Sequence, residues 1–147
     1  MGKAAKTKSS HKRKTWQEKL HNGKTHKVEK TEVKFADIPA GSRMLVPTPL
    51  IVDAYIRNIP RGHFTGIRQI REDLAAEYHA DYTCPVTTGI FIRIAAEAAY
   101  EEYKQGKSPA RITPFWRVIS ASSPAAKKLS FGILFLKEQQ RKEGIVT

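Results

Sequence analysis

Cysteine is nearly absent from this sequence of 147 residues, since Cys84 is its single example. One cysteine excludes a framework of intramolecular disulfides, and no Cys and His residues cluster at zinc spacing, so we predict neither a metal site nor a cofactor. No apolar run approaches the length of a transmembrane helix, and the N-terminal residues lack the apolar segment of a secretion signal. We therefore expect a cytoplasmic protein with no membrane partner.

Acidic residues are also scarce, with 14 Asp and Glu against 26 Lys and Arg, and the formal net charge is +12. The imbalance is strongest in residues 1–34, which hold eleven Lys and Arg but three Glu. A basic segment of this kind gathers phosphate contacts and gives nucleic-acid affinity without sequence preference. The alternatives are a solubilising or unstructured tail and non-specific adhesion to ribosomes, and we favour polyanion binding.

The N-terminal part reads as a tail rather than as a folded unit. We predict a basic, largely disordered tail and linker over residues 1–44, followed by one domain over residues 45–147. Within the tail, Trp16 and Leu20 lie four residues apart, so one short helical turn places both on one face. Three uses of Trp16 stay open here: docking on the domain, stacking on a base, or simple exposure.

The domain is predicted to be mainly α-helical because apolar residues recur at helical spacing between cap and stop signals. The clearest start is Thr48-Pro49, with Thr as N-cap and Pro at the first helical position. Residues 31–49 ahead of it are expected to be extended. The predicted helices run from Thr48 to about Asn58, from Thr65 to about residue 80, from Thr87 or Thr88 to Gln105, and from Ser130 to Gly144.

One stretch between two of these helices, residues 113–119, is apolar and carries two adjacent aromatics and a single Arg. Pro114 makes a long helix unfavourable here, and the β-branched Val118 and Ile119 favour an extended path. We therefore predict a buried or half-buried strand. By residue type alone, the aromatics are core-filling side chains.

The same stretch resembles the active-site segment P-C-H-R-V of the O6-alkylguanine-DNA alkyltransferases and their alkyltransferase-like relatives. Pro114, Arg117 and Val118 match, whereas Phe115 stands at the acceptor Cys and Trp116 at its partner His. Alkyl transfer needs a thiolate made by a neighbouring base, so the resemblance implies that this chemistry is absent from its usual place. It also implies that Phe115 and Trp116 line a remnant pocket and that Arg117 has a structural role.

Three more motifs follow the family's order. Ile59-Pro60-x-Gly62-x-x-Thr65 is similar to the family's helix entry, Gly89 stands at its recognition-helix glycine, and Glu143-Gly144 matches its terminal E-G. The resemblance covers about residues 45–146. It implies the family's C-terminal fold, a winged-helix-like helix-turn-helix domain with short extended segments.

Two departures from the family concern base flipping. The Tyr that follows the helix-entry Thr in the family is Gly66 here. The family's Arg, which takes the place of the flipped base in the DNA stack, aligns near Val86, where this sequence has no Arg. DNA contact through the helix pair is what the resemblance still implies. The family places this pair in the minor groove, where small residues allow close backbone approach.

The candidate DNA-binding residues lie on the helix pair and on the basic loop that follows it: Thr65, Arg68, Arg71, Thr87, Thr88, Gly89, Lys104, Lys107 and Arg111. The basic ones are expected to position phosphates. For the cluster of Lys104, Lys107 and Arg111, a solvated face is an equal alternative.

Three functions follow from these observations. The favoured one is a non-catalytic, alkyltransferase-like DNA-binding protein, a nucleoid-associated monomer whose partners are double-stranded DNA and repair proteins. The second is an active methylated-DNA–protein-cysteine methyltransferase with Cys84 as nucleophile at a helix start. A lone Cys in such a place is more often a small buried hydrophobe, which is the interpretation that we favour. The third is a general nucleic-acid-binding adaptor.

Overall fold

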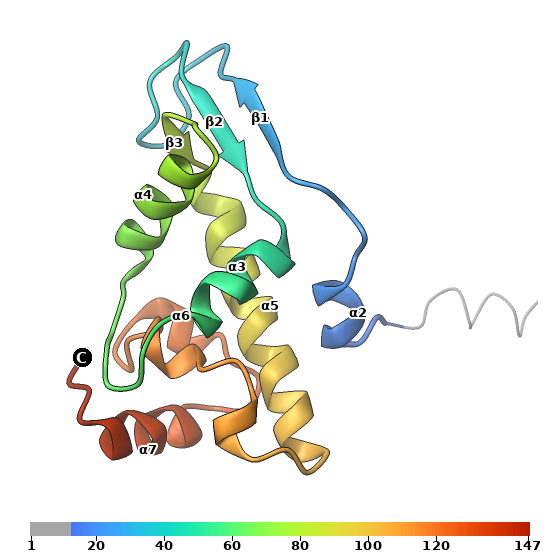
Figure 1. Ribbon diagram of the computed structural model, residues 1–147, viewed down its shortest axis with the longest axis vertical. Coiled ribbons are helices and arrows are strands. Elements are labelled where there is room, and N and C mark those ends of the chain that lie inside the picture. Colours follow the sequence, from blue (N-terminus) through green and yellow to red (C-terminus); the bar gives the residue numbers. More distant parts are fainter. Residues whose placement is uncertain (1–12) are drawn as a thin grey trace, which may run out of the picture.

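The computed structural model describes residues 13–147, and this part of the chain is mainly helical with one small sheet. Figure 1 shows the long helix α5 running through the molecule with the other elements around it. The helices are α2 (Trp16–Leu20), α3 (Pro49–Arg57), α4 (Ile67–Glu77), α5 (Pro85–Lys104), α6 (Pro124–Lys127) and α7 (Leu134–Glu143), with the 3-10 turns η1 (Pro109–Arg111) and η2 (Phe115–Arg117). The strands are β1 (Lys27–Lys30), β2 (Arg43–Val46) and β3 (Tyr82–Thr83). The predicted mainly α class is confirmed, and within residues 13–147 no helix combines the length and apolar character needed to cross a bilayer.

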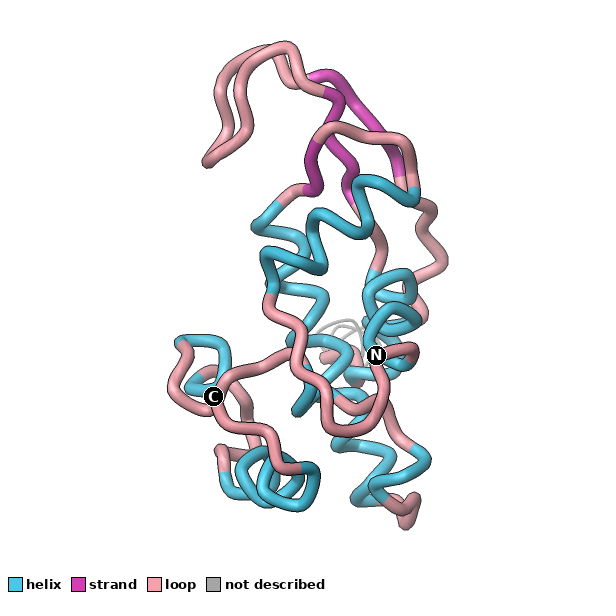
Figure 2. Tube along the Cα trace, turned by 60° about the vertical axis from the view of Figure 1, so that its left-hand side comes forward, coloured by secondary structure: helices cyan, strands magenta, loops and turns pink. Residues whose placement is uncertain are grey.

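The three strands form a small sheet at one end of the molecule, as Figure 2 shows. Their order is β1-β2-β3, with β1 antiparallel and β3 parallel to β2. Directly after β3, the amide of Cys84 donates to the carbonyl of Leu45 at 2.9 Å. The sheet thereby fixes the point at which α5 begins.

The first predicted helix is confirmed at both ends, because its signals are local. Thr48 is the N-cap of α3, and its hydroxyl accepts a hydrogen bond from the amide of Ile51 at 3.2 Å. Pro49 occupies the first helical position and Asn58 is the C-cap. A threonine hydroxyl followed by a proline satisfies or removes the first unpaired amides of a helix, which explains this start.

The next two helices begin elsewhere than predicted. The amide of Thr65 donates to the carbonyl of Arg117 at 2.8 Å, and Gly66 rather than Thr65 is the N-cap of α4. Cys84 occupies the N-cap position of α5, ahead of the predicted threonine caps. The hydroxyl of Thr88 donates back to the carbonyl of Cys84 at 2.6 Å. Both starts are therefore tied to backbone contacts with distant segments, of Thr65 with Arg117 and of Cys84 with Leu45.

The last helix shows one wrong and one confirmed terminus. Ser130 does not cap it, because its amide and hydroxyl both donate to the carboxylate of Glu97, at 2.7 Å and 2.5 Å. The helix α7 begins at Leu134 instead. Its predicted stop is confirmed: Gly144 is the C-cap with φ of 72°, a left-handed conformation that glycine adopts without steric cost.

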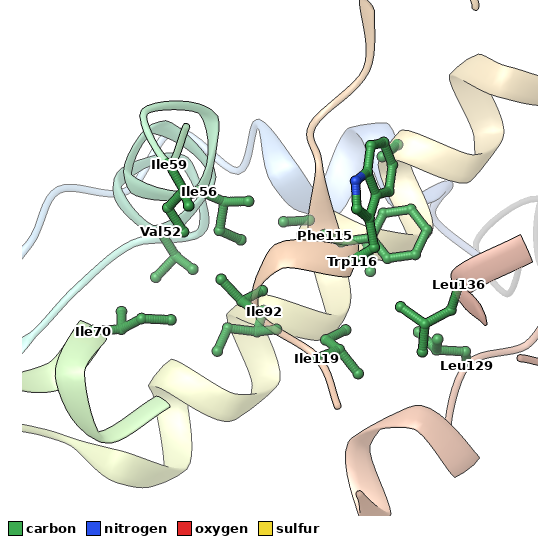
Figure 3. Packing of buried hydrophobic residues seen from close by; sticks show 14 of the residues in the cluster. Val52, Ile56, Ile59, Ile70, Ile92, Phe115, Trp116, Ile119, Leu129 and Leu136 are labelled. Atoms are coloured by element: carbon green, nitrogen blue, oxygen red, sulfur yellow. The ribbon is translucent and has the colours of Figure 1, made fainter. Parts of the chain in front are cut away.

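The hydrophobic core joins α3, α4, α5, η2 and α7 around the middle of α5. Figure 3 shows Phe115 and Trp116 of η2 entering this core beside Ile92 and Leu136. Phe115 is fully buried and Trp116 is 2% exposed. The core is thus built partly from the stretch that the sequence singled out.

The predicted strand over residues 113–119 is wrong, because this stretch forms the 3-10 turn η2. The amide of Arg117 donates to the carbonyl of Pro114 at 3.0 Å, and the amide of Val118 donates to the carbonyl of Phe115 at 3.1 Å. Neighbouring side chains on a strand point to opposite faces, whereas this turn buries the two adjacent aromatics together. Burial of both rings therefore favours the turn over the extended path.

Part of the segment predicted as a tail and linker is folded. In residues 13–44, the helix α2 packs on α5, and β1 pairs with β2. The carboxylate of Glu101 accepts hydrogen bonds from the amides of Trp16 and Gln17, both at 3.0 Å. The partner that orders α2 lies on α5, so a local pattern does not reveal it. The predicted disorder of residues 1–12 lies outside the described residues.

Candidate nucleic-acid interface

The expected remnant pocket around Phe115 and Trp116 is filled by their own side chains. The ring of Phe115 packs against those of Phe131 and Phe135, with centroid distances of 5.6 Å and 5.9 Å. Pro114 is buried as well. A base cannot reach the face of Phe115 unless this core opens, which corrects the expectation that it lines a remnant pocket.

Beside this core, one buried carboxylate joins three segments of the chain. Glu143, whose side chain is 2% exposed, accepts hydrogen bonds from Arg117 Nε and Nη2 at 2.9 Å and 2.8 Å. It also accepts from Trp116 Nε1 at 2.8 Å and from the amide of Gly62 at 2.9 Å. Such a forked Arg–carboxylate pair is both strong and directional. We call Glu143, Arg117, Trp116 and Gly62 the Glu143 node.

The Glu143 node explains the electrostatics of its carboxyl group. Burial raises the pKa of Glu143, but the hydrogen bonds from Arg117 and its neighbours outweigh burial and bring the pKa to about 2. Arg117 also donates from Nη1 to the carbonyl of Ile59 at 2.7 Å. The structure thus gives Arg117 the contacts of a structural residue, which the resemblance implied.

Cys84 lies at the start of α5, beside β2 and outside η2. Its side chain is 4% exposed and forms no disulfide. A reactive cysteine needs solvent access and a thiolate-stabilising neighbour. The burial of Cys84 fits the small buried hydrophobe that the sequence analysis favoured.

The candidate residues on α4 and at its start differ in what they can offer to a ligand. The side chain of Arg68 is 91% exposed and that of Thr65 is half-buried. Arg71, however, donates from its two Nη atoms to Asp37 at 2.9 Å and 2.8 Å, and from Nε to the carbonyl of Thr83 at 2.9 Å. These bonds use most of the donors of Arg71, so its contacts are structural.

On α5, the two threonines point away from solvent. Thr88 is fully buried, and the hydroxyl oxygen of Thr87 is buried without a hydrogen-bond partner in residues 13–147. Gly89 leaves room on the helix surface, and a Cβ atom there would lie 4.0 Å from Ile67 Cδ1. Of these three candidates, Gly89 is the one that faces a surface groove.

The expected cluster of Lys104, Lys107 and Arg111 is divided in the structure. Lys107 forms an ion pair with Glu102 at 3.0 Å. Lys104 lines a hollow beside Trp16, whereas Arg111 lines a different one together with Lys142. The three cations therefore do not converge on one ligand.

Sequence reasoning missed a groove along the first half of α5. It has a volume of about 660 Å³ and is lined by Trp16, Lys19, Val86, Gly89, Ile90, Arg93, Ile94, Ala125 and Lys128. We call it the α5 groove. Val86 and Ile90 are 54% and 51% exposed, so its floor is apolar.

The rim of the α5 groove is positively charged and partly aromatic. Lys19 Nζ lies 4.1 Å from the ring centre of Trp16, and the guanidinium carbon of Arg93 lies 5.2 Å from it. Both are cation–π contacts, which hold the ring and the charges at the same place. The sequence analysis missed the groove because Trp16 and Lys19 come from the segment predicted as a tail.

Three of the four motifs that carry the family resemblance meet in space, although they are far apart in the sequence, whereas Gly89 lies at the α5 groove. Gly62 comes from the helix-entry motif, Trp116 and Arg117 from the central motif, and Glu143 from the terminal E-G. Comparison of this chain with family models, with curated proteins and with solved structures gave no match.

Proposed function

We propose that this protein is a non-catalytic, alkyltransferase-like DNA-binding protein that holds duplex DNA against α4 and the first half of α5. The observation that carries the proposal is the α5 groove, with its apolar floor and cationic rim. The meeting of the resembling motifs at the Glu143 node supports the family assignment behind it.

The chemistry of the groove suits the minor groove of DNA. Proteins that bind there combine cations, which contact the phosphates, with apolar side chains that press against the base steps. Val86 and Ile90 supply exposed apolar side chains, and Gly89 allows the backbone of α5 to come close. Lys19 and Lys128 lie on the rim, where phosphate contacts are expected to position the duplex.

The absence of catalysis is part of the same proposal. Phe115 replaces the family's nucleophile and is fully buried, and Cys84 is 4% exposed. Alkyl transfer requires a nucleophile held within reach of its substrate. We therefore expect no mass increase of the protein after incubation with alkylated DNA.

A binding experiment tests the role of the groove. Fluorescence anisotropy of a labelled duplex is measured over a series of salt concentrations for the wild type and for the double variant Lys19→Ala/Lys128→Ala. We expect weaker binding and a slope of log K against log salt that is shallower by about 1 to 2, as for the loss of one or two phosphate contacts.

The matched control is Lys137→Ala on α7, an exposed cation outside the groove. Its salt slope should equal that of the wild type. An unchanged salt slope in the double variant would contradict the proposal. Equal affinity for duplex DNA and duplex RNA would instead favour the general nucleic-acid-binding adaptor. Nucleoid association and repair partners belong to the same proposal.

A further inference from the structure

A second hollow lies on other elements than the α5 groove, between the end of α3, η1, η2 and α7. Its volume is about 570 Å³, and five cations line it: Arg57, Arg61, Arg111, Arg117 and Lys142. These cations come from α3, the loop after it, η1, η2 and α7, which are far apart in the sequence. We call it the basic basin.

Carboxylates of the protein neutralise two of these cations. Arg117 is bound in the Glu143 node, and Arg57 donates from Nε to Asp53 at 2.9 Å. Arg61 reaches Glu143 only at 3.8 Å, and 69% of its side chain is exposed. Within residues 13–147, Arg111 and Lys142 form no ion pair with any carboxylate. The basin thus keeps a surplus of positive charge.

A side-chain amide at the wall of the basin has no partner within the described residues. Gln139 is 7% exposed and lines the basin, yet its side chain forms no hydrogen bond with any other residue of the described chain. Its neighbour Gln140, by contrast, donates to the carbonyls of Trp116 and Ile119 at 3.0 Å and 2.8 Å. The amide atoms of Gln139 are not among the buried side-chain atoms without a partner, so they reach solvent at the wall of the basin. The amide of Gln139 is therefore free to bind a ligand there.

We propose that the basic basin binds a small organic polyphosphate, such as a nucleoside triphosphate. Arginine guanidinium groups match the geometry of phosphate oxygens, and Arg61 and Arg111 present theirs at the rim. Pro109, which is half-buried, and Ala110, which is exposed, give the basin apolar surface for the organic part of such a ligand. Its volume lies within the range of small-molecule sites, which is several hundred Å³.

Isothermal titration calorimetry of the full chain tests the proposal with two probes, ATP and sodium tripolyphosphate. We expect saturable binding of ATP, at least tenfold weaker in Arg111→Ala and several-fold weaker in Gln139→Leu. Lys30→Ala removes one exposed cation from β1, away from the basin, and should bind ATP like the wild type. Arg111 is exposed, so its substitution is expected to leave the thermal melt unchanged.

The two probes distinguish the source of the phosphate. Tighter binding of ATP than of tripolyphosphate would support a site for an organic phosphate, and equal binding would overturn that part of the proposal in favour of inorganic polyphosphate. Absence of saturable binding, or an equal loss in Lys30→Ala, would overturn it altogether. The proposal would also be overturned if Arg111→Ala lost as much affinity for duplex DNA as for ATP, because the basin would then be a contact for the DNA backbone.

Discussion

Two glutamates connect distant parts of this chain, and they differ mainly in their partners. Glu143 joins three segments inside the molecule with a side chain that is 2% exposed. Glu101 on α5 holds the start of α2 through two backbone amides, and it forms no ion pair within residues 13–147. Buried charges without partners are costly, whereas amides near the surface can turn to water. We therefore expect the Glu143 node to stay intact in the folded protein, whereas α2 can separate from Glu101 without global unfolding.

The largest effect is expected when the core beside the Glu143 node is reshaped. Phe115→Cys with Trp116→His creates the P-C-H-R-V segment of the alkyltransferases that this stretch resembles, but it replaces two buried aromatic rings. We expect a loss of about 5 kcal/mol or more in unfolding free energy, because each such truncation leaves a cavity. The buried position also keeps the new thiol away from a substrate, so no efficient alkyl transfer should follow.

Thermal melts and single-turnover transfer from an alkylated duplex check this expectation together. Trp116→Phe is the matched control, because it keeps an aromatic ring in the core. Rapid transfer by a stably folded double variant would contradict the prediction and would show that the site opens to a flipped base.

A smaller but still large loss is expected from Glu143→Gln. It leaves the charge of Arg117 buried without its carboxylate, and breaking such a pair typically costs about 3 to 5 kcal/mol. Chemical denaturation measures the change. Glu138→Gln breaks an exposed pair with Arg141 on the same helix and should have little effect. Similar losses in both variants would contradict the importance of burial.

The same carboxylate predicts how stability depends on pH. The pKa of Glu143 is lowered from 4.5 to about 2 in the folded protein, so the unfolded chain binds the proton more tightly. The stabilisation is then complete above about pH 5 and is lost as the pH falls toward 2. It amounts to about 3 kcal/mol, and denaturation curves from pH 6 to pH 2 measure it. In Glu143→Gln this part of the pH dependence should disappear.

The sequence could predict the features that depend on neighbours along the chain. Thr48 and Pro49 started a helix as expected, and Gly144 ended one. The adjacent aromatics of η2 were predicted to be buried or half-buried, but their turn could not be read locally, since joint burial of both rings selects it. The α5 groove escaped prediction for a similar reason: Glu101 orders α2 from a position 85 residues away from Trp16.

The smallest effect on stability is expected at the surface contact, from Glu101→Gln. The amides of Trp16 and Gln17 lose a charged acceptor but can bind water instead, so we expect a cost of about 1 kcal/mol, as for a lost helix cap. Hydrogen exchange should become faster in α2 while the global melt changes little. Because α2 carries Trp16 and Lys19 to the α5 groove, the proposed function also predicts weaker binding of duplex DNA.

The control for this variant is Glu102→Gln, which changes the contact with the side chain of Gln17 and leaves the two amides bound to Glu101. Hydrogen exchange in α2 should change less in Glu102→Gln than in Glu101→Gln. Global unfolding of Glu101→Gln would show that α2 is part of the core and would remove the distinction between the two glutamates. Faster exchange with unchanged DNA affinity would keep that distinction but would place the DNA contact away from Trp16.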